Sequence, residues 1–276
     1  MKMAEQIGDY QVKPYPKIRR LMADGGRLGR QKHLVHGLFE MDVTQARRLI
    51  REERARRGEG LSFTAFVMAC LGRALDRDKS MHAYRAWGER LVIFDDVDVN
   101  TMFEVEVDGQ KIIRPHIIRA VNRKSMQDIH AEIRAFQAEH ADSPEGKWIG
   151  WFVLLPGFLR RFFLRLLFKN PHWWKAMNGT VALTSVGMFG QGGGWGIPVS
   201  NHTLQITLGG IAERPALVDG RVENRQMLCV TISFDHDLVD GAPAARFAQS
   251  LKELIEGRML FDEFNESKQT GASGPI

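Results

Sequence analysis

The stretch Asp235-His236-Asp237-Leu238-Val239-Asp240-Gly241 joins a run typical of a strand to a run typical of a helix. Before it, β-branched and aromatic residues alternate with other residues up to Phe234, and after it apolar residues recur at helical spacing over 242–255. Side chains in a turn at the end of a strand can face a cleft. We therefore expect His236 to lie beside a cleft at one edge of a sheet.

His236 has two interpretations. An imidazole titrates near neutrality, so it can remove a proton from a thiol or hydroxyl without a large pKa shift. In that case Asp240, four residues on, would fix the loop through local hydrogen bonds or an arginine partner. In the structural alternative, Asp240 caps the final helix, Gly241 supplies a tight turn and His236 is a surface residue. The stretch by itself favours neither.

The wider pattern His236-x-x-x-Asp240-Gly241, preceded by Ser233-Phe234-Asp235, resembles the signature of the acyltransferase core of 2-oxo-acid dehydrogenase complexes. Chloramphenicol acetyltransferase shares that fold and a shorter His-x-x-x-Asp pattern. Upstream, Leu183-Thr184-Ser185-Val186-Gly187-Met188-Phe189-Gly190 resembles the family's Thr/Ser-containing strand and Gly-x-x-Gly turn. Further parallels are Glu40 to Thr44, Ser62 to Ala74, Asp108-Gly109 and Lys124 to Ile129. The resemblance covers about 18–257.

The resemblance implies an α/β two-layer sandwich of the chloramphenicol acetyltransferase type, with a mixed sheet, helices on one side and a trimeric assembly. Active sites in this family lie in channels between subunits. The resemblance further implies coenzyme A or acyl-CoA as a substrate and no permanently bound cofactor.

The same resemblance assigns roles to individual residues. His236 would accept the thiol proton of coenzyme A or dihydrolipoamide. The hydroxyl of Thr184 would stabilise the oxyanion, and Ser185 is the second candidate for that role. Asp240 would complete the catalytic group, and Ser185, Gly241 and Phe189 would contact substrate. Because the family's sites lie between subunits, we expect His236 and Thr184 to act across a subunit boundary.

Two features depart from the family pattern. Asp237 stands where the family usually has arginine, and a carboxylate there is expected to raise the pKa of His236 or to change how Asp240 is held. Neither a lipoyl domain nor a subunit-binding domain precedes the core, so we expect a stand-alone enzyme. The alternative functions are a non-catalytic trimeric scaffold and a membrane-associated interaction protein.

Composition narrows the class of partner. The chain has 276 residues, 44% of them hydrophobic, and a formal net charge of +5. No nucleic-acid-binding motif accompanies the basic residues, so we expect no nucleic-acid partner and assign the early arginines and lysines between 19 and 57 to the phosphates of coenzyme A. Cys70 and Cys229 fall in predicted core segments, and the histidines lack metal-ligand spacing, so we predict no metal. The absence of a signal-like run in 1–10 indicates the cytoplasm.

The predicted elements fit one mixed α/β domain over 1–276, with a disordered tail at 271–276. Ser62 can cap a helix, and Ser125 with Asp128 forms a capping-box-like start of another. The expected strands lie at 33–43, 91–107, 112–121, 180–186, 204–211 and 227–234, and the expected helices at 43–57, 62–75, 125–140 and 242–255. The glycine-rich 187–196 lacks the Lys-Ser/Thr ending of a P-loop, so we interpret it as a tight loop beside the active site.

An aromatic, basic segment at 147–175 stands where the resemblance implies only a short connection. Pro156-Gly157 and three arginines argue against a membrane span. Phe158 to Phe168 is predicted to be an amphipathic helix, with Arg160, Arg161 and Arg165 grouped opposite the apolar residues. It could pack on the core or a neighbouring subunit, touch a membrane surface through 148–174, or form a hydrophobic lid. Between membrane and lid we prefer the lid, because the segment leads into the Thr184 strand.

Overall fold

The computed structural model of the chain describes residues 10–57, 61–107, 110–138, 152–187 and 192–263. Their main feature is a six-stranded sheet in the order β1-β8-β7-β6-β4-β5, beside a separate β2-β3 hairpin. The strands are β1 (Leu34–Asp42), β2 (Tyr84–Ala86), β3 (Arg90–Val92), β4 (Val99–Val107), β5 (Gln110–Ile118), β6 (Val181–Ser185), β7 (Leu204–Val218) and β8 (Arg221–Asp235).

The sheet is mixed. β1, β8 and β7 are antiparallel neighbours, β4 and β5 form a hairpin, and β6 runs parallel to both β7 and β4. β7 and β8 are each longer than expected, because their pairing continues to a turn at Asp219-Gly220. Both turn residues have positive φ, 48° and 77°, which matches the backbone twist of a tight hairpin.

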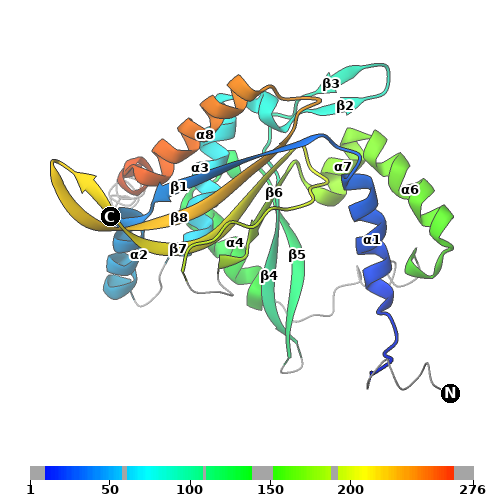
Figure 1. The fold of residues 1–276 in the computed structure, drawn as a ribbon, viewed down its shortest axis with the longest axis horizontal. Helices are drawn as coiled ribbons and strands as arrows, with labels where there is room; N and C mark the ends of the chain where they lie inside the picture. The colour runs from blue at the N-terminus through cyan, green and yellow to red at the C-terminus, as the bar shows by residue number, and fades with distance from the viewer. Residues whose placement is uncertain (1–9, 58–60, 108–109, 139–151, 188–191, 264–276) are drawn as a thin grey trace, which may run out of the picture.

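Helices cover one face of the sheet (Figure 1). α3 (Phe63–Arg77), α4 (Met126–Ala138) and α8 (Gly241–Glu256) contribute to one apolar core that includes Phe66, Ile129 and Leu251. α2 (Thr44–Arg57) packs against α8 and β8. Both predicted caps are confirmed: Ser62 Oγ accepts from Ala65 N, and Ser125 exchanges hydrogen bonds with Asp128.

A second group of helices gathers at one end of the sheet. α1 (Lys17–Gly29) lies beside α6 (Gly157–Lys169), which leads into α7 (Pro171–Asn178), as Figure 1 shows. α1 was not expected from the sequence, because it contains Gly25 and Gly26 and has no capping side chain at its start. Among the described helices, none combines the length and apolarity needed to cross a membrane.

The helix predicted at 158–168 forms as α6, but its orientation differs from the expected one. Arg160 does not group with the solvent-facing arginines: it is buried, and its guanidinium bonds Asp24 Oδ2 of α1 at 2.9 Å through Nε and 2.8 Å through Nη2. Its Nη1 also donates to the carbonyl of Leu155 at 2.6 Å. The buried carboxylate of Asp24 draws Arg160 inwards and so turns apolar side chains of α6 outwards.

Candidate active site

His236 lies directly after the end of β8. Its backbone N–H donates to the carbonyl of His33, the residue just before β1, and Asp235 N–H donates to Thr203. The two bonds fix the turn at the end of the sheet where β1 begins. The His236 side chain is exposed, and none of the described residues hydrogen-bonds its imidazole. The backbone of His236 is thus fixed, while its imidazole ring is accessible to a reactant.

Two ion pairs flank His236 on the chain. Lys32 Nζ lies 2.6 Å from Asp235 Oδ2, and the Asp235 side chain is almost fully buried. His33 Nδ1 lies 2.8 Å from Asp237 Oδ1, and this hydrogen bond raises the pKa of His33 and lowers the pKa of Asp237. The carboxylate of Asp237, the departure from the family pattern, is therefore engaged by His33.

Asp240 and Gly241 start α8, but not in the expected way. Asp240 occupies the N-cap position with φ −81° and ψ 162°, yet its side chain makes no capping hydrogen bond. Gly241 has no positive φ, and a Cβ atom there would meet nothing within 4 Å, so the tight turn expected of it is not formed. The exposed carboxylate of Asp240 is left available for a group outside the described residues of this chain.

Thr184 lies on the face of the sheet opposite the helices, near the end of β6. Its Oγ1 is 3.2 Å from Thr207 Oγ1 and 3.4 Å from Gln205 Nε2, both on β7. Successive residues of a strand point to opposite faces, so Ser185 points away from the Thr184 site. Phe189 lies outside the described residues. Gln205 and Thr207 were not predicted from the sequence, because the alternating pattern of a strand does not reveal which residues of a neighbouring strand its polar side chains contact.

The glycine-rich loop begins beside Thr184. A Cβ atom on Gly187 would lie 1.9 Å from the carbonyl oxygen of Gly209, and one on Gly210 would lie 1.9 Å from that of Gly192. Gly210 N–H also donates to the carbonyl of Gly194. The described part of the loop therefore packs backbone against backbone on β7, which only glycine permits. This agrees with the predicted tight loop.

Within one chain, Thr184 and His236 do not meet. Thr184 pairs with Thr207 on β7, and Thr207 pairs with Thr231 on β8. From Thr231 to His236 the chain advances about 16 Å, and the two strand spacings add about 10 Å sideways. The two side chains that the resemblance assigns to one reaction are thus separated across the sheet.

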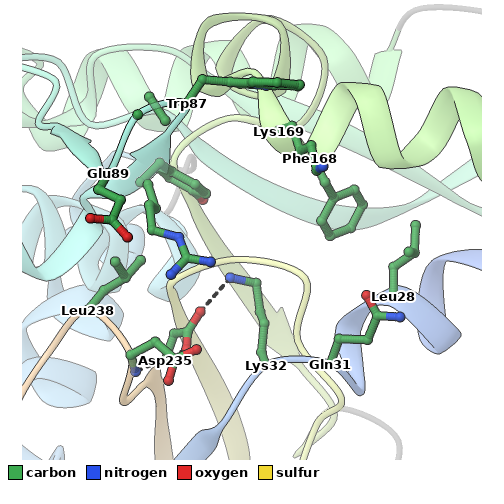
Figure 2. Close-up of a pocket in the computed structure, with 14 residues that line it drawn as sticks. Leu28, Gln31, Lys32, Trp87, Glu89, Phe168, Lys169, Asp235 and Leu238 are labelled. Carbon is green, nitrogen blue, oxygen red and sulfur yellow. Dashed lines mark hydrogen bonds and ion pairs between the residues drawn. The ribbon is translucent and has the colours of Figure 1, made fainter.

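A pocket of about 500 Å³ opens beside the His236 turn. The end of α1, the β2-β3 hairpin and the end of α6 enclose it (Figure 2). Lys32 reaches across it to Asp235, while Trp87 lies on the far side with Lys169 Nζ 5.1 Å from its ring centre. Its lining residues are Leu28, Gln31, Lys32, Tyr84, Arg85, Ala86, Trp87, Gly88, Glu89, Phe168, Lys169, Asp235, Asp237 and Leu238. No sequence motif marked this pocket, because it is formed by four distant segments.

The early basic residues fall into two groups. Arg19, Arg20 and Lys32 belong to α1 or its end, and Lys32 lies at the His236 end of the sheet, where it pairs with Asp235. The arginines of α2 follow the other end of β1, a strand of nine residues, or about 30 Å. Of these residues, Lys32 lies beside the His236 turn. Arg19 and Arg20 lie about 13–15 Å from the end of α1 that is next to that turn.

Comparisons of sequence cover the region of Thr184 and His236. Residues 175–261 match the family model of the 2-oxoacid dehydrogenases acyltransferase (catalytic domain). The mitochondrial dihydrolipoyllysine-residue succinyltransferase component of the 2-oxoglutarate dehydrogenase complex of Saccharomyces cerevisiae is 38% identical over 78 residues, 28% of this chain and 17% of the yeast protein. The Homo sapiens counterpart is 36% identical over 80 residues, 28% of this chain and 17% of its own length. The matched region is thus under a fifth of these curated relatives.

Comparisons of structure cover most of the chain. A probable dihydrolipoamide acetyltransferase from Listeria monocytogenes 4b F2365 superposes with a TM-score of 0.66 at 20% identity, over 90% of this chain and 95% of that one. The dihydrolipoamide acetyltransferase of Azotobacter vinelandii gives 0.67 at 19% identity, over 93% and 96%. The expected sandwich of a mixed sheet with helices on one side is confirmed, and so is the resemblance. Residues 175–261 match the acyltransferase catalytic domain family of the 2-oxoacid dehydrogenases, and the chain has the fold of these acyltransferase cores.

Proposed function

We propose that the protein is an acyltransferase that moves an acyl group between coenzyme A and a thiol, amine or hydroxyl acceptor. The proposal rests on the spacing of Thr184, His236 and Asp240 along the chain. A serine, a histidine and an asparagine have been investigated in the catalytic mechanism of the Azotobacter vinelandii acetyltransferase. Thr184 and Asp240 stand at the same distances along the chain from His236 as that serine and asparagine stand from that histidine. The chain thus carries a hydroxyl, a base and a polar side chain at the same sequence spacings as that enzyme.

In the proposed reaction, His236 removes the proton of an acceptor thiol, and the thiolate attacks the carbonyl carbon of acyl-CoA. The carbonyl electron pair moves to oxygen, and the hydroxyl of Thr184 donates to the oxyanion. Collapse of the intermediate breaks the bond to the sulfur of coenzyme A, which takes the proton back from His236. An amine or hydroxyl acceptor follows the same sequence.

The neighbours of Thr184 support its role as a donor. The amide nitrogen of Gln205 can only donate, so at 3.4 Å Thr184 Oγ1 is its acceptor. Accepting that bond leaves the hydroxyl hydrogen of Thr184 for Thr207 Oγ1 or for an oxyanion. Gln205 is therefore a positioning residue of the proposed site.

Replacing Thr184 by alanine is expected to lower kcat by about 10²- to 10³-fold, the usual effect of deleting one oxyanion donor, with little change in KM. Gln205→Met, which keeps the length of the side chain but removes the donor, should lower kcat less. In the Thr184→Ala background it should have no further effect. Steady-state kinetics of the two single variants and the double variant check this. An effect confined to KM would make Thr184 a binding residue instead.

The separation of Thr184 from His236 makes the proposed site one shared between subunits of a homotrimer. Co-expression of His236→Ala chains with Thr184→Ala chains is the test, since each variant alone lacks one half of every site. Random assembly should restore about one quarter of the wild-type activity, because a site works when each of its two chains supplies the intact residue. Mixed assemblies without activity would contradict a shared site.

The remaining assignments belong to the same proposal. A location in the cytoplasm and peripheral membrane contact through 148–174 are proposed with the trimer. A non-catalytic scaffold is the alternative function, motivated by Asp237 in place of arginine. The finding that Asp237 is bonded to His33 weakens that alternative, because the carboxylate has a partner other than His236.

A further inference from the structure

The outward face of α6 is apolar where a surface helix is normally polar. Phe158 is 69% exposed and Phe162 55%, and Leu166 one turn further on is also exposed. Trp173 and Met177, one turn apart on α7, are also exposed. The buried Asp24–Arg160 pair fixes this orientation from behind. Exposed apolar side chains that follow one another at one-turn spacing on two consecutive helices indicate an interaction surface, and we call these five residues the α6–α7 face.

The charges within the chain segments that form and adjoin the α6–α7 face are almost all positive. Asp24 is the only acidic residue in 10–32 and 152–178, and it is buried against Arg160. Arg165 and Lys169 are exposed on α6, and Arg19 and Arg20 are exposed on the neighbouring α1. Apart from Asp24, whose charge Arg160 offsets, no carboxylate of these segments opposes the positive field.

We propose that the α6–α7 face binds the surface of an anionic lipid bilayer, a property independent of the proposed catalysis. Aromatic and leucine side chains beside lysine and arginine are the composition of helices that lie in the membrane interface. The apolar side chains would enter the boundary between headgroups and acyl chains, while Arg165 and Lys169 meet lipid phosphates. Symmetric pairing of two copies through this face would bring like charges together.

The geometry also separates this face from the pocket beside the His236 turn. Phe168 and Lys169, at the end of α6, line that pocket, whereas Phe158 and Phe162 are not among its lining residues. The two phenylalanines can therefore contact a bilayer while the pocket stays open.

Flotation of the full chain with vesicles tests the proposal. We expect binding to phosphatidylcholine vesicles that contain phosphatidylglycerol to exceed binding to pure phosphatidylcholine by at least about tenfold, and to fall as salt rises. Phe158→Ser with Phe162→Ser, and separately Arg165→Gln with Lys169→Gln, should each remove most of the binding. Leu217→Ser with Val222→Ser is the matched control, since both side chains are 74% exposed on the β7-β8 hairpin. That control pair should bind like the wild type.

Three results would overturn the proposal. The first is wild-type protein that does not distinguish anionic from neutral vesicles. The second is a smaller particle mass in light scattering for the Phe158/Phe162 variant, which would make the face a contact between subunits. The third is an altered preference for acyl-chain length without any vesicle binding, which would make α6 a substrate lid.

Discussion

Alanine in place of His236 is expected to lower kcat by about 10³- to 10⁴-fold, because the variant has no group to take the proton of the acceptor thiol. The side chain is exposed, so its removal takes little from the core, and both the fold and the assembly should persist. Steady-state kinetics together with light scattering and circular dichroism would measure these effects.

The matched control for His236 is His172→Ala, which removes another exposed histidine, on α7. It should keep wild-type activity. Turnover at the wild-type rate in the His236→Ala variant would remove the residue from the mechanism and leave the scaffold interpretation.

Asp24→Asn is expected to lower the free energy of unfolding by about 3–5 kcal/mol, because it leaves the buried guanidinium of Arg160 without its charged partner. Asp24 is 2% exposed and Arg160 7%, so little water can replace the lost contact. Chemical denaturation at one fixed protein concentration measures the change, since assembly into the proposed trimer would contribute to stability as well.

Two controls separate the buried pair from ordinary surface charge. Glu52→Gln breaks the exposed i,i+4 pair with Arg48 and should cost less than about 1 kcal/mol. Asp24→Leu with Arg160→Met replaces the pair by apolar residues and should recover most of the loss. Equal stability of Asp24→Asn and the wild type would mean that α1 and α6 are not held together by this contact.

Much of the fold was predictable because local chemistry and tertiary structure agree there. Alternation marked β1 and β8, and the hydroxyls of Ser62 and Ser125 marked the starts of α3 and α4. α1 was not predicted because its glycines lower helix propensity, although one of them, Gly29, is required by packing. A Cβ atom on Gly29 would lie 2.4 Å from Asn201 Oδ1, a contact invisible in the local pattern.

The candidate site was predictable residue by residue but not as an arrangement. The motifs singled out His236 and Thr184, yet only the strand register shows that they lie apart. A helical projection put Arg160 with the other arginines, because it cannot include a buried acid on another helix. The partner of Asp237 was likewise hidden, since His33, just before β1, is distant from it in sequence.

The distance between Thr184 and His236 has a consequence for how such an enzyme would come into operation. A newly made chain would carry both catalytic residues but could not bring them together, so it would be inactive until it assembled with other subunits. Specific activity would then report the degree of assembly rather than the amount of protein, and it would fall on dilution below the concentration at which subunits part. A chain defective in both residues would also inactivate sites of its intact neighbours, since it disables both of the sites in which it takes part.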